Sequence, residues 1–209
     1  MLKIYGVKTS SNVQKVLWCC GELGLAFQRE EIGGAFGNNR SPAYLALNPN
    51  GLVPTIDEDG FILWESNVIV RYLCARHSTG RLYPEPLAER FDAERWMDWQ
   101  QTTLNPVSAG AFRQWVRTPA AQRQAEVIAH SVQSTEPLFA LLDAHLATRA
   151  YMLGDRFTMA DIPVGCEAHR WFGLPQTEYT RPSWPHVERW FADLRSRPGA
   201  RGVLDLALE

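Results

Sequence analysis

Residues 48–72 constrain the fold more than any other part of the chain. The run 48–51, Asn-Pro-Asn-Gly, has the composition of a turn, because Pro49 fixes φ and Gly51 allows a positive φ. A short apolar strand over 53–56 follows, and its Pro54 cannot donate a hydrogen bond to a central sheet ladder. The Glu-Asp-Gly run at 58–60 then predicts a hairpin into a second strand, Phe61–Trp64.

A helix is expected to begin at Glu65 and Ser66, directly after that strand, because apolar residues recur from there at helical spacing. Two backbone surfaces are thus free to bind a ligand: the strand edge at Pro54 and the N-terminus of this helix. A helix N-terminus carries unpaired N–H groups and a partial positive charge, which suit a carboxylate. Glu65 and Ser66 therefore have two candidate roles, helix capping and ligand binding.

The rest of the first half alternates short strands and helices. The pattern predicts a strand at Leu2–Tyr5, a helix over 12–23 ended by Gly24, a strand over 26–32 and a short helical turn at Pro42–Leu47. Together with 48–72, the order is β-α-β followed by α-β-β-α. This order indicates a thioredoxin-like sandwich with a small mixed sheet.

The second half shows no convincing strand. The predicted division is an α/β, thioredoxin-like domain over 1–80, a proline-rich linker over 81–87 and an all-α helical bundle over 88–209. The first helix expected in the bundle covers 88–103 and continues to 116 with a bend or break at Pro106. The second covers 118–147, is opened by Thr118-Pro119 and is kinked or split at Pro137. Two more helices are expected over 162–171 and 184–195.

Composition narrows the functional classes. With 209 residues, 45% hydrophobic residues and a formal charge of −2, the chain gives no reason to invoke nucleic acid or an anionic membrane. No apolar run approaches the roughly 20 residues that span a bilayer, and the N-terminus lacks the apolar core of a signal peptide. We therefore expect a cytoplasmic protein. The four cysteines and five histidines show no metal-ligand spacing, so no metal site is predicted.

The segment 48–72 resembles the glutathione-binding half of the cytosolic glutathione transferases. In that family, the residue before a cis-proline pairs its backbone with the cysteinyl part of glutathione, and an acidic-Ser pair holds the γ-glutamyl carboxylate. The matching residues here are Val53 with Pro54, preceded by Leu52, and Glu65 with Ser66. The resemblance extends to the helical second half, so it covers nearly the whole chain.

The resemblance implies a serine-type enzyme, bacterial-like and related to the theta and beta classes. Glutathione would be its co-substrate, a small electrophile its second substrate, detoxification its role and a homodimer its assembly. The expected reaction is attack of the glutathione thiolate on an electrophilic carbon, by conjugation or by displacement of a leaving group such as halide. Asn39 falls near a position where relatives use a polar side chain on the glycyl carboxylate.

The residue that activates the thiol is expected near the end of the first strand. Ser11 and Gln14 fit a capping box, which leaves the Ser10 hydroxyl to face the ligand. Alignment with the first helix of the family also places Ser10 at the catalytic serine. Thr9, Ser11 and Asn12 remain alternatives, and both serines would have a purely structural role if they only cap the helix.

The second substrate is expected between the two halves, although an aromatic stripe at helical spacing more often belongs to a core. Arg113 is singled out because it would hold an anionic substrate such as a small haloacid. Thr158-x-x-Asp161 is a capping box variant with a structural role. The candidate pocket residues are Trp99, Thr103, Phe112, Arg113, Trp115 and Trp171.

Two alternative functions remain open. One is a transferase-like binding module without catalysis, although such a module need not keep the serine region, Val53-Pro54 and Glu65-Ser66 together. The other is a glutathione-dependent isomerase of small unsaturated acids. Relatives of that kind carry a Ser-Ser-Cys run with a nearby arginine, whereas this chain has Ser10-Ser11-Asn12 with Lys15.

Overall fold

The first half of the chain is built on a four-stranded sheet. The structure is a computed structural model that describes all 209 residues. The strand order is β2-β1-β3-β4. β1 (Leu2–Tyr5) pairs in parallel with β2 (Phe27–Glu30) and antiparallel with β3 (Thr55–Glu58), which forms the hairpin with β4 (Phe61–Trp64). β3 begins two residues later than expected, and Pro54 stays outside the ladder, where its missing N–H breaks no pair.

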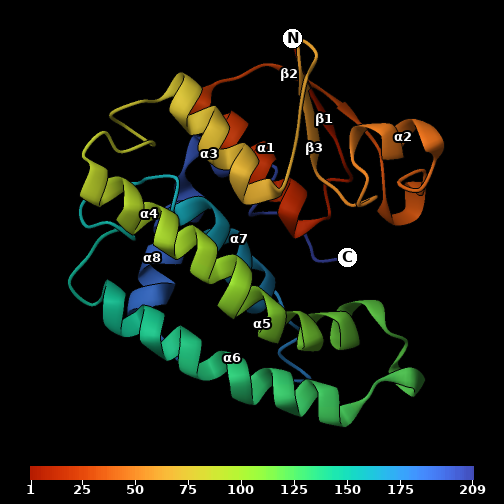
Figure 1. Cartoon of the computed structure of the whole chain (residues 1–209). Helices are drawn as coiled ribbons and strands as arrows, with labels where there is room; N and C mark the ends of the chain where they lie inside the picture. The colour runs from red at the N-terminus through yellow and green to blue at the C-terminus, as the bar shows by residue number, and fades with distance from the viewer.

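Helices cover both faces of this sheet. α1 (Ser11–Leu23) and α3 (Ser66–His77) pack against each other on one face, and α2 (Pro42–Leu47) lies on the other, after a 3-10 turn at Gly34–Phe36 (Figure 1). The arrangement confirms the predicted thioredoxin-like half. The residues after α3 are packed rather than free: Leu82 is buried, and its carbonyl accepts from the Met159 N–H at 3.0 Å.

The second half is entirely helical, as predicted (Figure 1). Its first helix runs without a break to residue 117, and Pro106 follows directly after a π turn, a local irregularity of the kind at which helices accommodate a proline. The elements are α4 (Leu87–Trp99), a π turn (Gln100–Leu104), α5 (Asn105–Phe112), a second π turn (Arg113–Arg117), a 3-10 turn (Ala120–Gln122), α6 (Ala125–Leu146), α7 (Asp161–Phe172), α8 (Pro185–Ser196) and a 3-10 turn (Pro198–Ala200).

Two expectations about the middle of this half were wrong. Thr118 and Pro119 do not open the long helix, which begins only at Ala125. The Arg123 side chain binds the carbonyls of Thr118 and Trp115 at 3.2 and 2.9 Å, and these bonds stabilise an irregular link instead. Pro137 does not split the long helix, since α6 continues through it.

The two halves meet along α1, which packs against α7 as well as α3. Trp18 of α1 is fully buried, and a Cβ added at Gly165 of α7 would lie 2.8 Å from its ring. Only glycine allows this approach without displacing the ring. A second tie joins the halves at the far end of α1, where Arg197 forms an ion pair with Glu22 at 2.8 Å.

Asp161 has the structural place that its capping motif predicts. It is fully buried, and its carboxylate accepts at 2.9 Å from the N–H groups of Met152 and Thr158 and from the indole N–H of Trp190. Burial raises the pKa of Asp161 to about 6, although these hydrogen bonds act in the opposite direction. The side chain is therefore ionised at neutral pH and joins α7, α8 and the loop before α7.

We expect Asp161→Ala to lower the free energy of unfolding by about 3 kcal/mol, because three buried N–H groups lose their acceptor together. Urea unfolding at pH 7 measures the change. Asp155→Asn, on the exposed part of the same loop, is the control and should leave the urea midpoint unchanged. Equal midpoints for Asp161→Ala and Asp155→Asn would rule out the structural role.

Candidate active site

The loop before β3 is held by a small buried polar cluster. Asn48, 2% exposed, donates to the Leu52 carbonyl at 2.8 Å and to Thr55 Oγ1 at 3.2 Å. The Tyr44 hydroxyl donates to the same carbonyl at 2.6 Å. Gly51 has the positive φ expected of it, 62°, with its carbonyl bound by the Asn39 amide at 2.8 Å. These bonds fix the backbone on either side of Val53.

Val53 presents free backbone at the edge of the sheet. Its peptide bond to Pro54 is cis, as the family resemblance implies. Neither the N–H nor the carbonyl of Val53 takes part in a backbone hydrogen bond of the protein. An extended ligand can therefore pair with Val53 as a further strand would.

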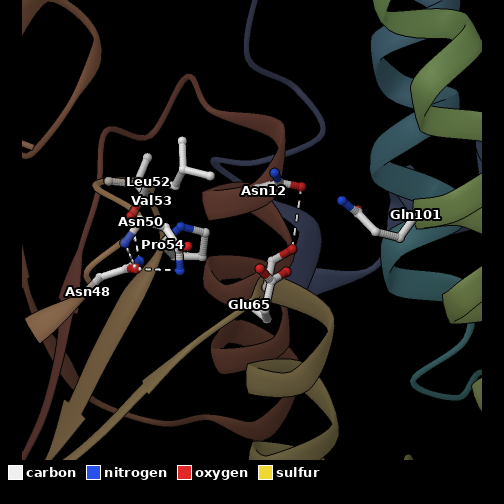
Figure 2. A pocket seen from close by; sticks show the side chains of 9 residues that line it. Asn12, Asn48, Asn50, Leu52, Val53, Pro54, Glu65 and Gln101 are labelled. Carbon is white, nitrogen blue, oxygen red and sulfur yellow. Dashed lines mark hydrogen bonds between the residues drawn. The ribbon is translucent and has the colours of Figure 1, made fainter.

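The N-terminus of α3 faces the same space. Glu65, at φ 75°, turns the chain from β4 into the helix, and Ser66 is its first residue, 4% exposed. Figure 2 shows Glu65 and Asn12 on one side of a cavity, Val53 and Pro54 opposite, and Gln101 reaching in from the helical half. The volume of this cavity is about 130 Å³, and its lining is Asn12, Asn48, Asn50, Leu52, Val53, Pro54, Glu65, Ser66 and Gln101.

Ser10 is the N-cap residue of α1, and its side chain makes no capping hydrogen bond. The predicted capping box was wrong, because Ser11 is already the first helical residue and Gln14 is buried. The Ser10 hydroxyl is nevertheless free of the helix, as expected. It lines a second cavity, of about 460 Å³, with Val7, Thr9, Gly34, Ala35, Phe36, Val53, Arg117 and Glu209.

A third cavity, of about 470 Å³, lies against the helical half and has three arginines in its lining. It is formed by Gln101, Asn105, Pro106, Ala109, Phe112, Arg113, Arg117 and Arg170. Residues shared between linings connect the three spaces: Val53 joins the first and second, Gln101 the first and third, and Arg117 the second and third. Each of the three spaces thus adjoins the other two, and Ser10 lines the second.

The predicted residues fall into two groups. Besides Ser10 and the first-cavity residues already named, Phe112 and Arg113 line the third cavity, while Ser11, Asn39 and Thr103 line none of the three. The tryptophans lie elsewhere. Trp171 is 1% exposed and stacks on Phe139, Trp115 stacks on Tyr179, and Trp99 lines a separate hollow beside Trp96. Trp115 and Trp171 therefore belong to the core, and Trp99 lies away from the three cavities.

The missed residues of the site include four with charged or amide side chains that bear on its chemistry: Lys15, Gln101, Arg117 and Arg170. Lys15 is 1% exposed, and burial lowers the pKa of its ammonium to about 8. One sequence feature marks it, since it stands three and four residues before the buried Trp18 and Cys19 and so shares their face of α1. The other three lie in or beside the π turns and α7, and no local pattern distinguishes them.

No group of three or more histidine, cysteine or acidic side chains is placed to hold a metal ion. None of the helices has the length and apolar character needed to cross a bilayer.

The first half is thioredoxin-like and has an open strand edge before a cis-proline, and it is joined to a helical half. This combination defines the two-domain class of thiol-transferring enzymes. Comparison with known proteins identifies the family. Residues 9–76 match the model of the glutathione S-transferase N-terminal domain, and residues 104–198 match that of the C-terminal domain.

Individual relatives are similar to this chain over nearly its full length. Glutathione S-transferase GstB of Escherichia coli (strain K12) is 40% identical over 206 residues, 98% of each chain. Glutathione S-transferase 4 of Zea mays is 28% identical, over 97% of this chain and 91% of its own. The theta class glutathione S-transferase of Xanthomonas axonopodis pv. citri, crystallised with glutathione bound, is 46% identical with a TM-score of 0.95, over 100% of this chain and 99% of that one.

The chain belongs to the glutathione S-transferase family, as the sequence motifs predict. It is an enzyme of that family, and the expected fold class and co-substrate are confirmed with it.

Proposed function

We propose that the protein transfers the thiolate of glutathione to a small, negatively charged electrophile. The observation that carries this proposal is the convergence of three free groups on adjoining cavities: the Ser10 hydroxyl, the Val53 backbone and the N-terminus of α3. Three guanidinium groups border the cavity next to them.

Each part of glutathione has a complementary group in this proposal. The Val53 N–H and carbonyl pair with the cysteinyl backbone. The γ-glutamyl carboxylate accepts from Ser66 and the first N–H groups of α3, where the helix dipole favours an anion. The Glu65 carboxylate, itself negative, suits the α-ammonium group instead. Asn39 is the candidate for the glycyl carboxylate, although its amide already binds the Gly51 carbonyl.

Ser10 stabilises the thiolate and does not act as a nucleophile. A free thiol with a pKa near 8.5 is only a few per cent ionised at pH 7. A hydrogen bond to a charged group contributes roughly 1.5–3 kcal/mol, which lowers the thiol pKa by about one to two units. The thiol proton leaves to water, sulfur forms the bond to carbon, and the leaving group departs with its electron pair.

We expect Ser10→Ala to bind glutathione with unchanged affinity but to raise the pKa of the bound thiol by about one to two units. Ser66→Ala should instead weaken binding about tenfold, because a hydrogen bond to a carboxylate is lost. Calorimetry measures the affinity, and ultraviolet absorbance of the thiolate measures the pKa.

Ser11→Ala is the matched control for Ser10, one residue along the chain, and should change neither quantity. A raised thiol pKa in Ser11→Ala, with none in Ser10→Ala, would transfer the role to Ser11. Failure of the wild type to bind millimolar glutathione would favour the binding-module function instead.

The charge of the third cavity supports an anionic electrophile. Arg113, Arg117 and Arg170 line it, and no acidic side chain does. Arg170 is already paired with the buried Glu167, so the charge available to a ligand comes from Arg113 and Arg117. Burial and the two neighbouring guanidinium groups lower the pKa of Arg117, as expected where positive charges crowd together. Arg117 also borders the Ser10 cavity, so it is better placed than Arg113 to hold a carboxylate beside the attacking sulfur. A small haloacid has the required charge and leaving group.

Arg117→Met should raise the KM for a haloacetate about tenfold, equivalent to about 1.4 kcal/mol, and leave the KM for a neutral electrophile unchanged. Steady-state kinetics with both substrates measures the difference. Arg113→Met should show a smaller effect, and Arg201→Met, far along the chain on an exposed turn, none. An equal rise in KM for the neutral substrate would contradict a role in charge recognition.

We also propose that the enzyme is a homodimer. Apolar side chains are exposed on neighbouring surfaces of β4, α3 and α4: Phe61 (48%), Trp64 (37%), Val68 (41%), Leu87 (65%) and Phe91 (60%). Apolar surface of this kind commonly marks an interface. A second copy of the chain is the occupant that the family favours.

Phe61→Arg and Phe91→Arg should shift the protein from dimer to monomer, because each places a charge in the apolar contact. Sedimentation velocity at micromolar concentration measures the assembly. Leu141→Arg, an equally drastic change on the exposed side of α6, is the control and should remain dimeric. A wild type that sediments as a monomer would contradict the proposal.

A cytoplasmic location completes the proposal. All four cysteines are free thiols, and Cys19 and Cys74 remain unlinked with their sulfur atoms 3.6 Å apart. Free thiols so close together are typical of a reducing compartment.

A further inference from the structure

Lys15 places a buried charge behind the glutathione cavity. Its side chain is 1% exposed, whereas lysine is almost never fully buried without a partner. The ammonium donates to Gln100 Oε1 at 2.9 Å, to Gln101 Oε1 at 3.1 Å and to Ser66 Oγ at 3.4 Å. Its three donors are thus engaged, and every acceptor is neutral.

The charged groups around Lys15 do not neutralise it by contact. Glu167 of α7 forms an ion pair with Arg170 and accepts from Ser108 at 2.6 Å and Gln100 at 3.1 Å. Glu65, at the start of α3, is exposed to solvent. Burial raises the pKa of the Cys166 thiol on α7 to about 12, so it stays uncharged at neutral pH. No carboxylate lies within ion-pair distance of the ammonium.

Two of the three acceptors border the first cavity. Ser66 and Gln101 both contact Lys15 on one side and line that cavity on the other. An anion that accepts from the Ser66 hydroxyl would therefore lie one hydrogen bond beyond the ammonium. At that separation, in a desolvated site, the attraction between opposite charges is strong. The buried cation has no contact anion in the protein, and the adjoining cavity is where one would bind.

We propose that Lys15 is a positioning residue for glutathione, whose ammonium attracts the γ-glutamyl carboxylate to Ser66 and orients the hydroxyl and amide that border the cavity. This inference rests on the proposed function of that cavity. Lys15 does not touch the ligand. It acts through Ser66 and Gln101, and it leaves the thiol to Ser10.

Binding and protonation are coupled as a result. In the free protein, burial lowers the pKa of Lys15 to about 8, and a carboxylate at Ser66 raises it again. The protonated form therefore binds more tightly. Affinity is full below about pH 8 and falls as the pH rises above that value, and binding near pH 8 takes up a proton.

The test measures the affinity for S-methylglutathione by calorimetry between pH 6.5 and 9.5. This ligand has no thiol to titrate, and its amine titrates identically with every variant. We expect Lys15→Met to bind about tenfold more weakly at pH 7, with a smaller deficit at pH 9.5. Lys15→Arg, which keeps the charge, should recover most of the affinity. Lys3→Met is the matched control, because Lys3 lies in β1 and lines none of the three cavities, and this variant should bind the ligand like the wild type.

A second ligand separates attraction from structural support. This ligand is S-methylglutathione whose γ-glutamyl α-carboxylate has been converted to the amide. It should bind the wild type weakly, and its affinity for Lys15→Met should equal its affinity for the wild type. Equal losses for both ligands in Lys15→Met would mean that the residue only supports the fold, and would overturn the inference.

One measurement needs no variant, so it remains valid if Lys15→Met fails to fold. Calorimetry of the wild type at pH 8, in two buffers of different ionisation enthalpy, reports the protons taken up on binding. No uptake at pH 8 contradicts the inference. Uptake at pH 8 that disappears at pH 6.5 supports it once the share of the ligand's own amine, measured with the carboxamide ligand, has been subtracted. A wild type that does not bind S-methylglutathione would instead refute the proposed function itself.

Discussion

The packing of α1 against both α3 and α7 is the constraint on which the site depends. α1 supplies Ser10 at its N-cap, Asn12 in its first turn and Lys15 in its second, so one helix borders both the first and the second cavity. Its depth is set by Trp18, which lies against Gly165 with no room for a Cβ. A bulkier residue at Gly165 would move α1 away from the helical half, and Ser66 and Gln101 would then lose their common partner.

The site combines neutral and charged groups according to what each must do. Neutral hydrogen bonds from Asn48 and Tyr44 fix the loop at Val53, where a ligand backbone needs only matching geometry. Charge is concentrated where ligand charge would lie, with Lys15 behind the first cavity and three arginines around the third. A buried ion with neutral contacts is costly to the free protein, and a bound anion would relieve that cost. Stability is thus exchanged for affinity at Lys15.

Sequence patterns predicted the parts of this site that local chemistry determines. The turn at 48–51, the positive φ of Gly51, the hairpin and the start of α3 each depend on residues within a few positions of one another. The patterns failed where partners are distant. Lys15 and Gln100 are 85 residues apart, and nothing near either shows that they meet. The capping box at Ser11 failed for another reason: α1 starts one residue earlier than local preference indicated, so Ser11 is helical and does not cap the helix.

The two π turns explain why the site residues of the helical half were the hardest to predict. A π turn holds one more residue than an α-helical turn, so it shifts later side chains by about 100° around the axis. Gln100 and Gln101 lie in the first, and Arg113 and Arg117 in the second. Gln100, at the start of the first turn, joins the buried network, whereas Gln101 lines the cavity. A regular helical period through 88–116 does not include this shift, so it does not show that Arg117 lines the site while Trp115 stacks on Tyr179.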